Sequence, residues 1–484
     1  MLKTGENCWR IEQAVRAATI IDADDYFNAA RAAFLKARRR IMLIGWDFDA
    51  RIAFGENKGD DGPETIGDFI YWLVERNPEL EVFLLRWDLG AVKTLFRGST
   101  IFTVMKWMTH DRIHTKLDGM HPPGASHHQK IVVIDDCFAF CGGIDMTGDR
   151  WDTREHRDDD PRRKRPNGKL YDPWHDATTA LEGPVAAALG ELARDRWHRA
   201  GGHELAPVTS PNDCWPDPLE PQFTHVEVAI ARTVPKMDDQ EPIDEIEKLY
   251  LDQIAAAERF IYAESQYFAS RRIAEALAKR LDEKDGPEII LVNPQSAQGW
   301  LEPIAMDTAR ARLFEALRRR DNHGHLRMYH PFTANDVPIY VHAKILIVDD
   351  RILRVGSSNM NNRSLGLDTE CDVTIDTRRP GNDACSDTII AVRDGLLAEH
   401  LGVTPQRVAA TIAQTGSLIA AIETLSGGGG RTLRAYQTPD LAEVEKWLAD
   451  NEVLDPESPD DMFETLDRPG LLQRLHGWRH HGDE

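Results

Sequence analysis

The sequence lacks the features that mark membrane-spanning and conventionally secreted proteins. Its apolar run at Phe69–Val74 is far shorter than the roughly 18 residues that a membrane-spanning helix needs. Residues 1–10 contain no apolar segment of the kind found in secretory signal peptides. We therefore expect no transmembrane segment and a cytoplasmic protein. Export would need a route that uses no cleavable signal peptide.

Positive charge and cysteine are also scarce. The chain has 58 Lys and Arg against 80 Asp and Glu, which gives a formal net charge of -22. A dedicated nucleic-acid binder presents a basic surface to phosphates, so this composition predicts no nucleic-acid partner, although a local basic groove can exist on an acidic protein. The six cysteines follow neither a disulfide nor a zinc-binding spacing. We expect reduced thiols, no metal and no cofactor.

One internal repeat is present. Lys130–Asp136 and Lys344–Asp350 match almost letter for letter, and each copy is followed by a glycine turn. Each also follows a histidine two residues upstream, and these histidines, His128 and His342, lie nearly half the chain apart. A pattern that occurs twice indicates a duplication, whereas a solenoid would need more copies.

Both halves alternate short helices and strands. The expected helices are 24–40, 245–259 and 273–281, and the expected strands are 41–45, 82–85, 260–263 and 288–292. This alternation predicts an α/β fold with two tandem α/β/α sandwich lobes, related by a pseudo-two-fold axis, and an active site between them. We expect an N-terminal lobe over 1–205, a Pro-rich linker over 206–225, a C-terminal lobe over 226–400 and a helical, acidic tail of unknown role over 401–484.

The repeated motif has the residues needed for phosphate chemistry. Alternate residues of a strand point to the same face, so the histidine and the lysine of each copy project together. Imidazole acts as a nucleophile or an acid–base group near neutral pH, and an ammonium group binds a phosphate oxygen. Each copy is half of a site, and the pair would place two histidines on opposite sides of one phosphate. His114-Thr-Lys116 has the same short form but lacks the aspartate and the glycine turn, so we interpret His114 as an incidental surface or loop residue.

With these motifs the chain resembles the phospholipase D superfamily, whose members carry paired HKD motifs. The second copy continues as Gly356–Ser364, which is similar to the family's GSxNxNxRS extension. Further blocks resemble the lipid-hydrolysing branch: Trp151–Thr153, Pro173–Asp176, Glu182–Pro184, Arg196–Trp197 and Glu264–Phe268. Single-motif nucleases of the family need a dimer to assemble two motifs, whereas this chain holds both, so we expect a monomer.

The resemblance implies a role for each matching residue. His128 is expected to be the nucleophile that forms a phosphohistidine, and His342 the general acid and later the base; the sequence leaves the reverse assignment open. Lys130 and Lys344 are expected to bind the non-bridging oxygens. Ser357 and Asn359 are expected to help them, whereas the first copy has Gly143 and Asp145 at those two places and the role of Asp145 stays open.

Carboxylates complete the expected site. Glu370 and Asp152 are expected to hold the second nitrogen of the nucleophilic imidazole in each half, or alternatively to form salt bridges with Arg363 and Arg150. Asp135 and Asp349 close the HKD motifs, but they lie five residues beyond the lysine. That spacing favours a structural role near the end of the strand.

The expected activity is hydrolysis of the distal phosphodiester of a phosphatidylcholine-like glycerophospholipid to phosphatidate and a free alcohol. The partner is thus a phospholipid at a membrane surface, and an added alcohol could intercept the intermediate in transphosphatidylation. The alternatives are a cardiolipin synthase-like phosphatidyl transferase and a phospholipase D-family nuclease. A lipid-binding scaffold with a dead site is disfavoured because both histidines and both lysines are present.

Overall fold

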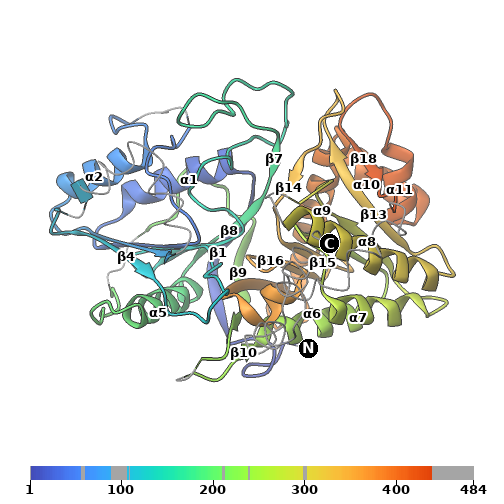
Figure 1. Ribbon diagram of the computed structural model, residues 1–484, viewed down its shortest axis with the longest axis horizontal. Helices are drawn as coiled ribbons and strands as arrows, with labels where there is room; N and C mark the ends of the chain where they lie inside the picture. The colour runs from blue at the N-terminus through green and yellow to red at the C-terminus, as the bar shows by residue number, and fades with distance from the viewer. Residues whose placement is uncertain are drawn as a thin grey trace, which may run out of the picture.

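A computed structural model describes residues 2–55, 60–88, 106–107, 109–209, 213–237, 240–297 and 302–438. The described chain forms two lobes joined side by side (Figure 1). One sheet runs through both lobes, in the order β18-β13-β12-β11-β15-β16-β17-β9-β1-β8-β6-β5-β2-β3-β4, with β10 (Ile243–Asp244) paired to β9 off this path. Among the described helices none is both long enough and apolar enough to cross a membrane.

Two long strands join the lobes at the centre of the sheet. β1 (Arg10–Ile21) and β9 (Phe223–Val234) pair antiparallel in a register that places Arg10 opposite Ile230 and Ala17 opposite Phe223. Outward from this pair, the two halves repeat the same strand order, with β1-β8-β6-β5-β2-β3-β4 matching β9-β17-β16-β15-β11-β12-β13. The duplication in the sequence is therefore a two-fold relation between lobes, and among the described strands of this sheet β10 and β18 (Thr432–Ala435) lack a counterpart.

The remaining strands are short and mostly buried. In the first lobe they are β2 (Arg40–Gly45), β3 (Glu81–Trp87), β4 (Ile113–Asp118), β5 (Ile131–Ile134), β6 (Phe138–Gly142) and β8 (Ala177–Glu182). In the second lobe they are β11 (Phe260–Glu264), β12 (Glu288–Val292), β13 (Leu326–Phe332), β15 (Ile345–Val348), β16 (Ile352–Gly356) and β17 (Glu370–Asp376). A separate two-stranded sheet joins the lobes through β7 (Trp174–His175) and β14 (Tyr340–Val341).

Helices cover the sheet. Those of the first lobe are α1 (Ala23–Lys36), α2 (Ile66–Arg76) and α5 (Pro184–Arg199), and those of the second are α6 (Glu245–Ala255), α7 (Arg271–Leu281), α8 (Glu302–Arg320), η1 (Arg363–Leu367), η2 (Asp383–Cys385) and α9 (Ser386–Leu401). Their apolar faces bury against the sheet in two outer cores, one under α1 and α2 and one under α6 and α7. The α/β fold with two tandem lobes is confirmed.

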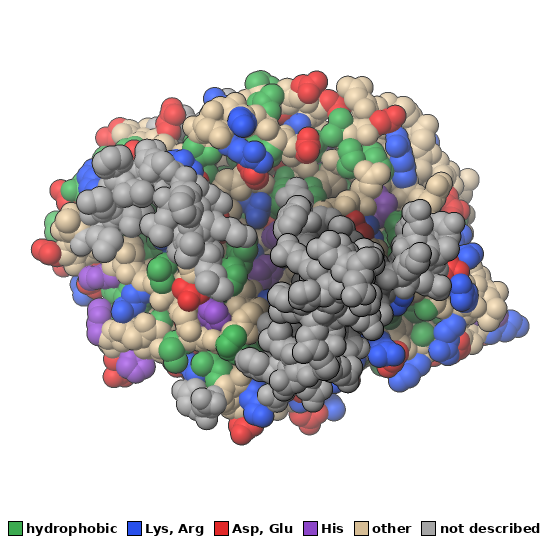
Figure 2. All heavy atoms as spheres, viewed as in Figure 1, with side chains coloured by type: hydrophobic (Ala, Val, Ile, Leu, Met, Phe, Trp, Pro, Cys, Tyr) green, Lys and Arg blue, Asp and Glu red, His purple; other side chains and the backbone are tan. Residues whose placement is uncertain are grey.

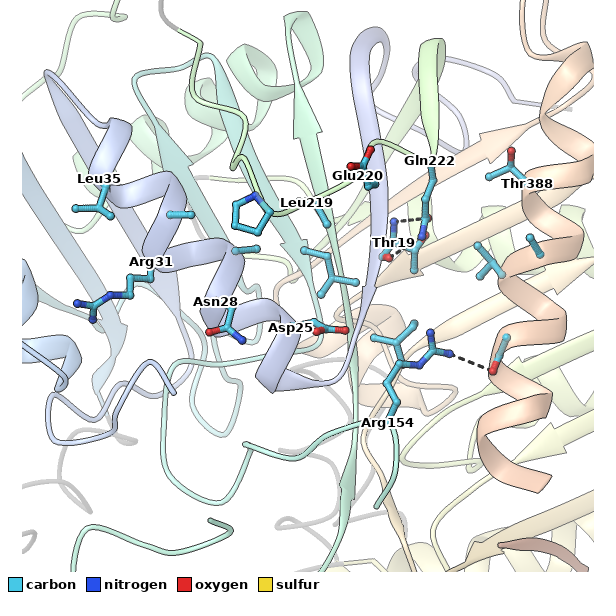
Figure 3. Close-up of a pocket in the computed structure, with 18 of the residues that line it drawn as sticks. Thr19, Asp25, Asn28, Arg31, Leu35, Arg154, Leu219, Glu220, Gln222 and Thr388 are labelled. Atoms are coloured by element: carbon cyan, nitrogen blue, oxygen red, sulfur yellow. Dashed lines mark hydrogen bonds between the residues drawn. The ribbon is translucent and has the colours of Figure 1, made fainter. Parts of the chain in front are cut away.

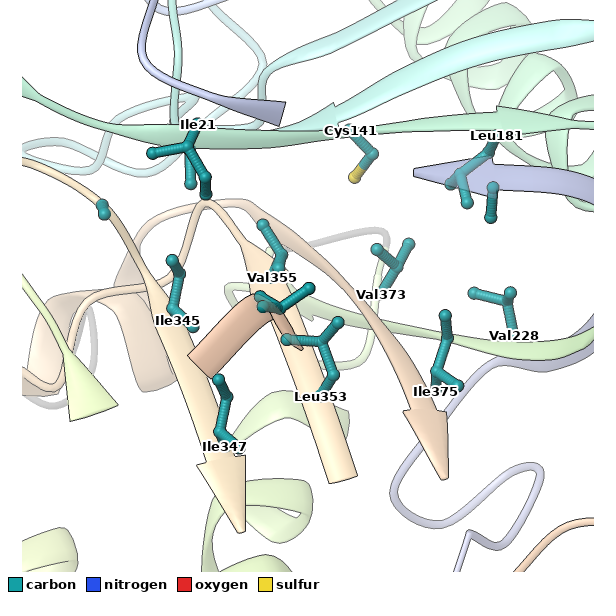
Figure 4. Packing of buried hydrophobic residues seen from close by; sticks show 14 of the residues in the cluster. Ile21, Cys141, Leu181, Val228, Ile345, Ile347, Leu353, Val355, Val373 and Ile375 are labelled. Atoms are coloured by element: carbon teal, nitrogen blue, oxygen red, sulfur yellow. The ribbon is translucent and has the colours of Figure 1, made fainter. Parts of the chain in front are cut away.

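A third core lies between the lobes. Ile21, Cys141 and Leu181 of the first lobe face Val355 and Val373 of the second across this core (Figure 4). The Sγ atoms of Cys141 and Cys371 come within 3.7 Å of each other there. Because this interlobe core is apolar and closely packed, it fixes the relative position of the lobes and hence of the two motifs.

The described part of the tail packs on the second lobe. α10 (Pro405–Thr415) and α11 (Leu418–Leu425) contribute Val408 and Ile422 to the interlobe core, and β18 pairs antiparallel with β13. The region after 401 is thus part helix and part strand up to residue 438, and the expected acidic stretch at 455–461 lies outside the described residues. The lobe and linker bounds at 205, 226 and 400 stay predictions.

Candidate active site

Each motif lies at the start of an equivalent strand. His128 and Lys130 precede β5, and His342 and Lys344 precede β15. In both copies the lysine Nζ donates a hydrogen bond to the backbone carbonyl of its own histidine, at 2.8 Å for Lys130. The histidine and lysine therefore project together, as the alternation of a strand requires.

Backbone pairing between the lobes fixes both histidines. His342 N donates to the carbonyl of His175 at 2.7 Å, directly after the parallel β7–β14 pair. In the matching place of the other copy, His128 N donates to the carbonyl of Thr369 at 3.0 Å, next to a parallel bridge between His127 and Thr369. Each motif is thus hydrogen-bonded through its backbone to a segment of the opposite lobe.

These segments supply the carboxylates, and they do so crosswise. His128 Nδ1 lies 3.0 Å from both Oε1 and Oε2 of Glu370 in the second lobe. His342 Nδ1 lies 2.7 Å from Oδ2 of Asp176 in the first lobe, and both side chains are buried. Each imidazole is held at Nδ1, which leaves Nε2 of both rings for chemistry.

The expectation for Asp152 was wrong. Its carboxylate accepts from His156 Nδ1 at 3.0 Å, from Arg163 Nη1 at 3.1 Å and from the backbone N–H of Trp174 at 3.0 Å. Asp152 follows the first motif in sequence, but the lobe interface brings Glu370 to His128 and Asp176 to His342 instead. Asp176 stands in the block Pro173–Asp176, but its side chain was not singled out. Spacing within the second motif cannot point to a carboxylate that comes from the first lobe.

Glu370 is held by the second motif's extension. Ser357 Oγ donates to Oε2 of Glu370 at 2.5 Å, and Ser364 Oγ donates to Oε1 at 2.7 Å. Ser357 is fully buried, so it positions Glu370 and is not placed as the phosphate ligand expected from the sequence. The Asn359 amide makes only two side-chain contacts, each at 3.5 Å, with Ser265 and Gln266, and its role toward phosphate stays a prediction.

Glycine replaces Ser357 in the first copy for a steric reason. A Cβ atom at Gly143 would come within 2.4 Å of Oδ1 of Asp176. The Asp176 carboxylate therefore occupies the space that a side chain at 143 would need. The copies differ at this place because the Asp176 carboxylate lies against position 143, whereas in the second copy the Ser357 side chain contacts Glu370.

The aspartates of the motifs lie at the far end of the strands. Asp135 accepts from the backbone N–H groups of Arg38, Arg39 and Arg40 at 2.7–2.8 Å. Asp349 accepts in the same way from three consecutive N–H groups, those of 258–260, at 2.7–2.9 Å. Four residues lie between each aspartate and its lysine, which corresponds to roughly 17 Å along a strand. They are structural caps for the loops before β2 and β11, as their spacing favours, and they do not belong with the catalytic residues of the motifs.

Lys130 is partly neutralised where it lies. Its Nζ is 3.1 Å from Oδ2 of Asp145, and both side chains are buried. The sequence left the role of Asp145 open, and the structure shows it as the counter-ion of Lys130 and an acceptor for the backbone N–H of Trp46.

The incidental motif at His114 lies in β4, where the ring stacks on Phe83, and the expected loop position was wrong.

Burial suppresses positive charge in this site. Burial, and after it the charges of the two lysines, holds the pKa of His128 well below its usual value. Burial, and after it Lys344 and Arg150, does the same for the pKa of His342. Burial lowers the pKa of Lys344 to about 7 and raises the pKa of Glu370 to about 8. A bound anion would favour the protonated forms of the two histidines and of Lys344.

A fully buried network lies behind Asp176. His175 Nδ1 lies 2.7 Å from Oε1 of Glu399, and its Nε2 lies 2.7 Å from Oε2 of Glu264. Asp22 accepts from the backbone N–H of Asp176 at 3.0 Å, so the network supports the segment that orients His342. Two groups of described residues bring one oxygen or nitrogen each to within 4.8 Å of one another and could hold a metal: Asp22, His156, His175 and Glu399, and His175, Glu264 and His400.

The larger hollows of the described surface are elsewhere. Figure 3 shows a pocket of about 680 Å³ between α1 and α9, lined by Asn28, Arg31, Arg154 and Thr388 among others. Arg154 closes its inner side through a hydrogen bond from Nη2 to the carbonyl of Gly395. No residue of either motif lines this pocket.

Comparison with known families agrees with this arrangement. Residues 33–213 match a family model described as phospholipase D, and residues 250–386 match one described as cardiolipin synthase, PLD-like domain. The two models thus cover both motifs and their carboxylates. Each match falls within one of the two lobes.

Curated relatives and a solved structure extend the likeness. Phospholipase D A of Dictyostelium discoideum is 25% identical over 469 residues, which are 80% of this chain and 35% of that protein. Phospholipase D1 of Saccharomyces cerevisiae is 26% identical over 79% of this chain and 28% of that protein, so the chain spans about a third of these relatives' length. The crystal structure of phosphatidylserine synthase from Haemophilus influenzae shares the fold, with a TM-score of 0.54, 13% identity and coverage of 86% of this chain and 96% of that one. The chain belongs to the phospholipase D superfamily.

Proposed function

We propose that this protein is a phospholipase D, which cleaves the distal phosphodiester of a phosphatidylcholine-like glycerophospholipid. The observation that carries the proposal is the crossed pair of imidazole–carboxylate contacts, His128 with Glu370 and His342 with Asp176. Two histidines held at Nδ1 and lying beside two lysines can attack and protonate opposite sides of one phosphate. We also expect a monomer that acts peripherally at a membrane surface.

The first step forms a covalent intermediate. His128 Nε2 attacks phosphorus while its Nδ1 proton stays hydrogen-bonded to Glu370. The bond between phosphorus and the headgroup oxygen breaks, and that oxygen takes a proton from Nε2 of His342. Lys130 and Lys344 stabilise the charge that builds on the non-bridging oxygens. The products of this step are the free alcohol and a phosphatidyl–histidine.

The second step reverses the roles. His342, now neutral, takes a proton from water, and the hydroxide oxygen attacks phosphorus as the bond to His128 Nε2 breaks. The result is phosphatidate and the original enzyme, with His342 again protonated. An added primary alcohol can replace water in this step, which gives transphosphatidylation.

The same chemistry would serve a phosphatidyl transferase. The match of residues 250–386 to a model described as cardiolipin synthase, PLD-like domain, supports this second candidate. A nuclease is less favoured, because basic and acidic side chains are interspersed over the described part of the face in Figure 2, and the whole chain is acidic.

The test is mass spectrometry of phosphatidylcholine vesicles incubated with the protein in dilute ethanol. Phosphatidylethanol and phosphatidate should form with the wild type and not with His128→Ala or His342→Ala. Lipid-linked products without free phosphatidate would favour the transferase. Intact lipid beside nicked plasmid DNA would identify a nuclease and replace the proposal. If lipids with a panel of other headgroups and the DNA all stayed intact, the proposed phosphodiesterase activity would be contradicted.

A further inference from the structure

Arg150 lies beside the histidine pair and has no place in the steps above. Its guanidinium carbon is 4.2 Å from the centroid of the Trp174 ring. Trp174 stacks on Tyr340 at 4.6 Å and lies 5.2 Å from the His342 ring. The guanidinium and the imidazole that is proposed to protonate the leaving group thus both lie next to one indole ring.

The polar atoms of Arg150 are poorly satisfied. Nη1 donates to the carbonyl of Asp149 at 3.3 Å, and Nε is buried without a hydrogen-bond partner. Within the described residues no carboxylate lies at ion-pair distance from Arg150, whereas Arg162, Arg163 and Arg165 of the same loop pair with Asp160, Asp152 and Asp149. A buried donor without a partner is costly, and a ligand oxygen would satisfy it.

The two lysines of the motifs supply little free positive charge. Lys130 lies against Asp145, and burial lowers the pKa of Lys344 to about 7. Arg150, which pairs with no carboxylate among the described residues, adds a positive charge that these two lysines do not supply.

We propose that Arg150 is a third cationic phosphate ligand, which donates to a non-bridging oxygen of the diester on the His342 side. The proposal rests on the phosphodiesterase function proposed above and names a ligand of its phosphate. Arg150 offers a planar pair of donors, which a lysine cannot reproduce, and Trp174 holds that plane in position. Arg150 therefore replaces the charge that the first motif loses to Asp145.

Binding of inorganic phosphate tests the proposal without any turnover. Isothermal titration calorimetry would compare the wild type with Arg150→Gln, Arg150→Lys and Arg76→Gln. Arg76 is the matched control, because its guanidinium also lies over an indole, that of Trp72, at 5.0 Å. We expect Arg150→Gln to weaken phosphate binding at least about tenfold, Arg150→Lys to weaken it less, and Arg76→Gln to change it less than about twofold.

Kinetics then separate a phosphate ligand from a headgroup contact. If Arg150 binds the phosphate, Arg150→Gln lowers kcat/KM by a similar factor for bis(4-nitrophenyl) phosphate and for phosphatidylcholine vesicles. Loss with the vesicles alone would overturn the proposal in favour of a headgroup or membrane contact. Unchanged phosphate affinity with lost activity would overturn it in favour of a structural role through Trp174. If the protein turned over no diester, the proposed function would fail, but the phosphate affinities would still decide the role of Arg150. If Arg150→Gln does not fold, the same comparison is made with Arg150→Lys.

Discussion

The exchange of carboxylates between the lobes predicts which of two aspartates the chemistry needs. Asp176→Asn removes the charge 2.7 Å from Nδ1 of His342 and offers an amide that can hold the wrong tautomer. Asp152→Asn changes a carboxylate that is just as buried but contacts neither motif histidine. The two substitutions are matched in size and chemistry, so they differ mainly in what each side chain touches.

The magnitude for Asp176→Asn follows from its contact with His342. A charge-assisted hydrogen bond contributes about 1.5–3 kcal/mol, which is roughly 10- to 150-fold in rate when it stabilises the imidazolium of the transition state. An amide that holds the wrong tautomer adds to this loss, and the corresponding change in serine proteases costs about 10⁴-fold in kcat. We expect kcat to fall by about 10²- to 10⁴-fold, with KM and melting temperature little changed.

Asp152→Asn should act on stability instead. It leaves Arg163 and His156 buried without their counter-charge, and breaking a buried ion pair on one side costs about 3–5 kcal/mol. The assay is kcat per folded molecule on a soluble diester, with unfolding followed by chemical denaturation. Full activity in Asp176→Asn, or a chemical defect in a stable Asp152→Asn protein, would refute the crossed assignment.

Further predictions concern protons, caps and thiols. Burial lowers the pKa of Lys344 to about 7, so a bound anion should raise that pKa and cause the protein to take up protons above pH 7. Calorimetry of sulfate binding in buffers of different ionisation enthalpy should show this proton uptake at pH 8. Asp135→Ala and Asp349→Ala each orphan three backbone N–H groups and should lower the free energy of unfolding by about 2–4 kcal/mol, with kcat per folded molecule little changed. The Sγ atoms of Cys137 and Cys214 lie 2.6 Å apart, so mild oxidation should join them, and intact mass should fall by two hydrogens unless either is replaced by serine.

Much of the fold could be predicted from periodicity and from the repeat. The expected strand at 288–292 has the bounds of β12, and the expected helix at 245–259 begins where α6 begins. Helices ended earlier than expected, since α1 stops at Lys36 and α6 at Ala255. Both expected helices ran into short loops that the carboxylates of Asp135 and Asp349 cap, which is a long-range contact that local pattern does not reveal.

The long central strands were missed for a different reason. β1 and β9 join the two halves into one sheet, and β1 carries Arg10, Glu12 and Arg16 on one face and Gln13 and Thr19 on the other, so it has no clear apolar alternation. Residues of β9 were partly assigned to the linker, because proline before Phe223 gave that region a loop composition. Pairing of strands more than two hundred residues apart is set by tertiary packing, and no window of the sequence contains it.

The histidines and lysines of the site could be predicted because the motif is local and repeated. Their carboxylates could be predicted only in part, since Glu370 was found through the family pattern and Asp176 was not. The structure explains the difference: both acids follow a residue that pairs with the other motif's backbone, Thr369 in one case and His175 in the other. A search for acids directly before β8 and at the start of β17 would have found both, but it needs the strand order first.

Crossed support has a consequence for how the duplicated halves work together. Each lobe holds a motif histidine whose orienting carboxylate comes from the opposite lobe, and the interlobe core holds the two lobes together. Movement of one lobe against the other would therefore misalign both imidazoles at once, because in the described structure each imidazole takes its carboxylate from the other lobe. Apolar packing, the β7–β14 bridge and the buried ionic network around His175 all oppose such a movement, so we expect substitutions at this interface to disturb both histidines together.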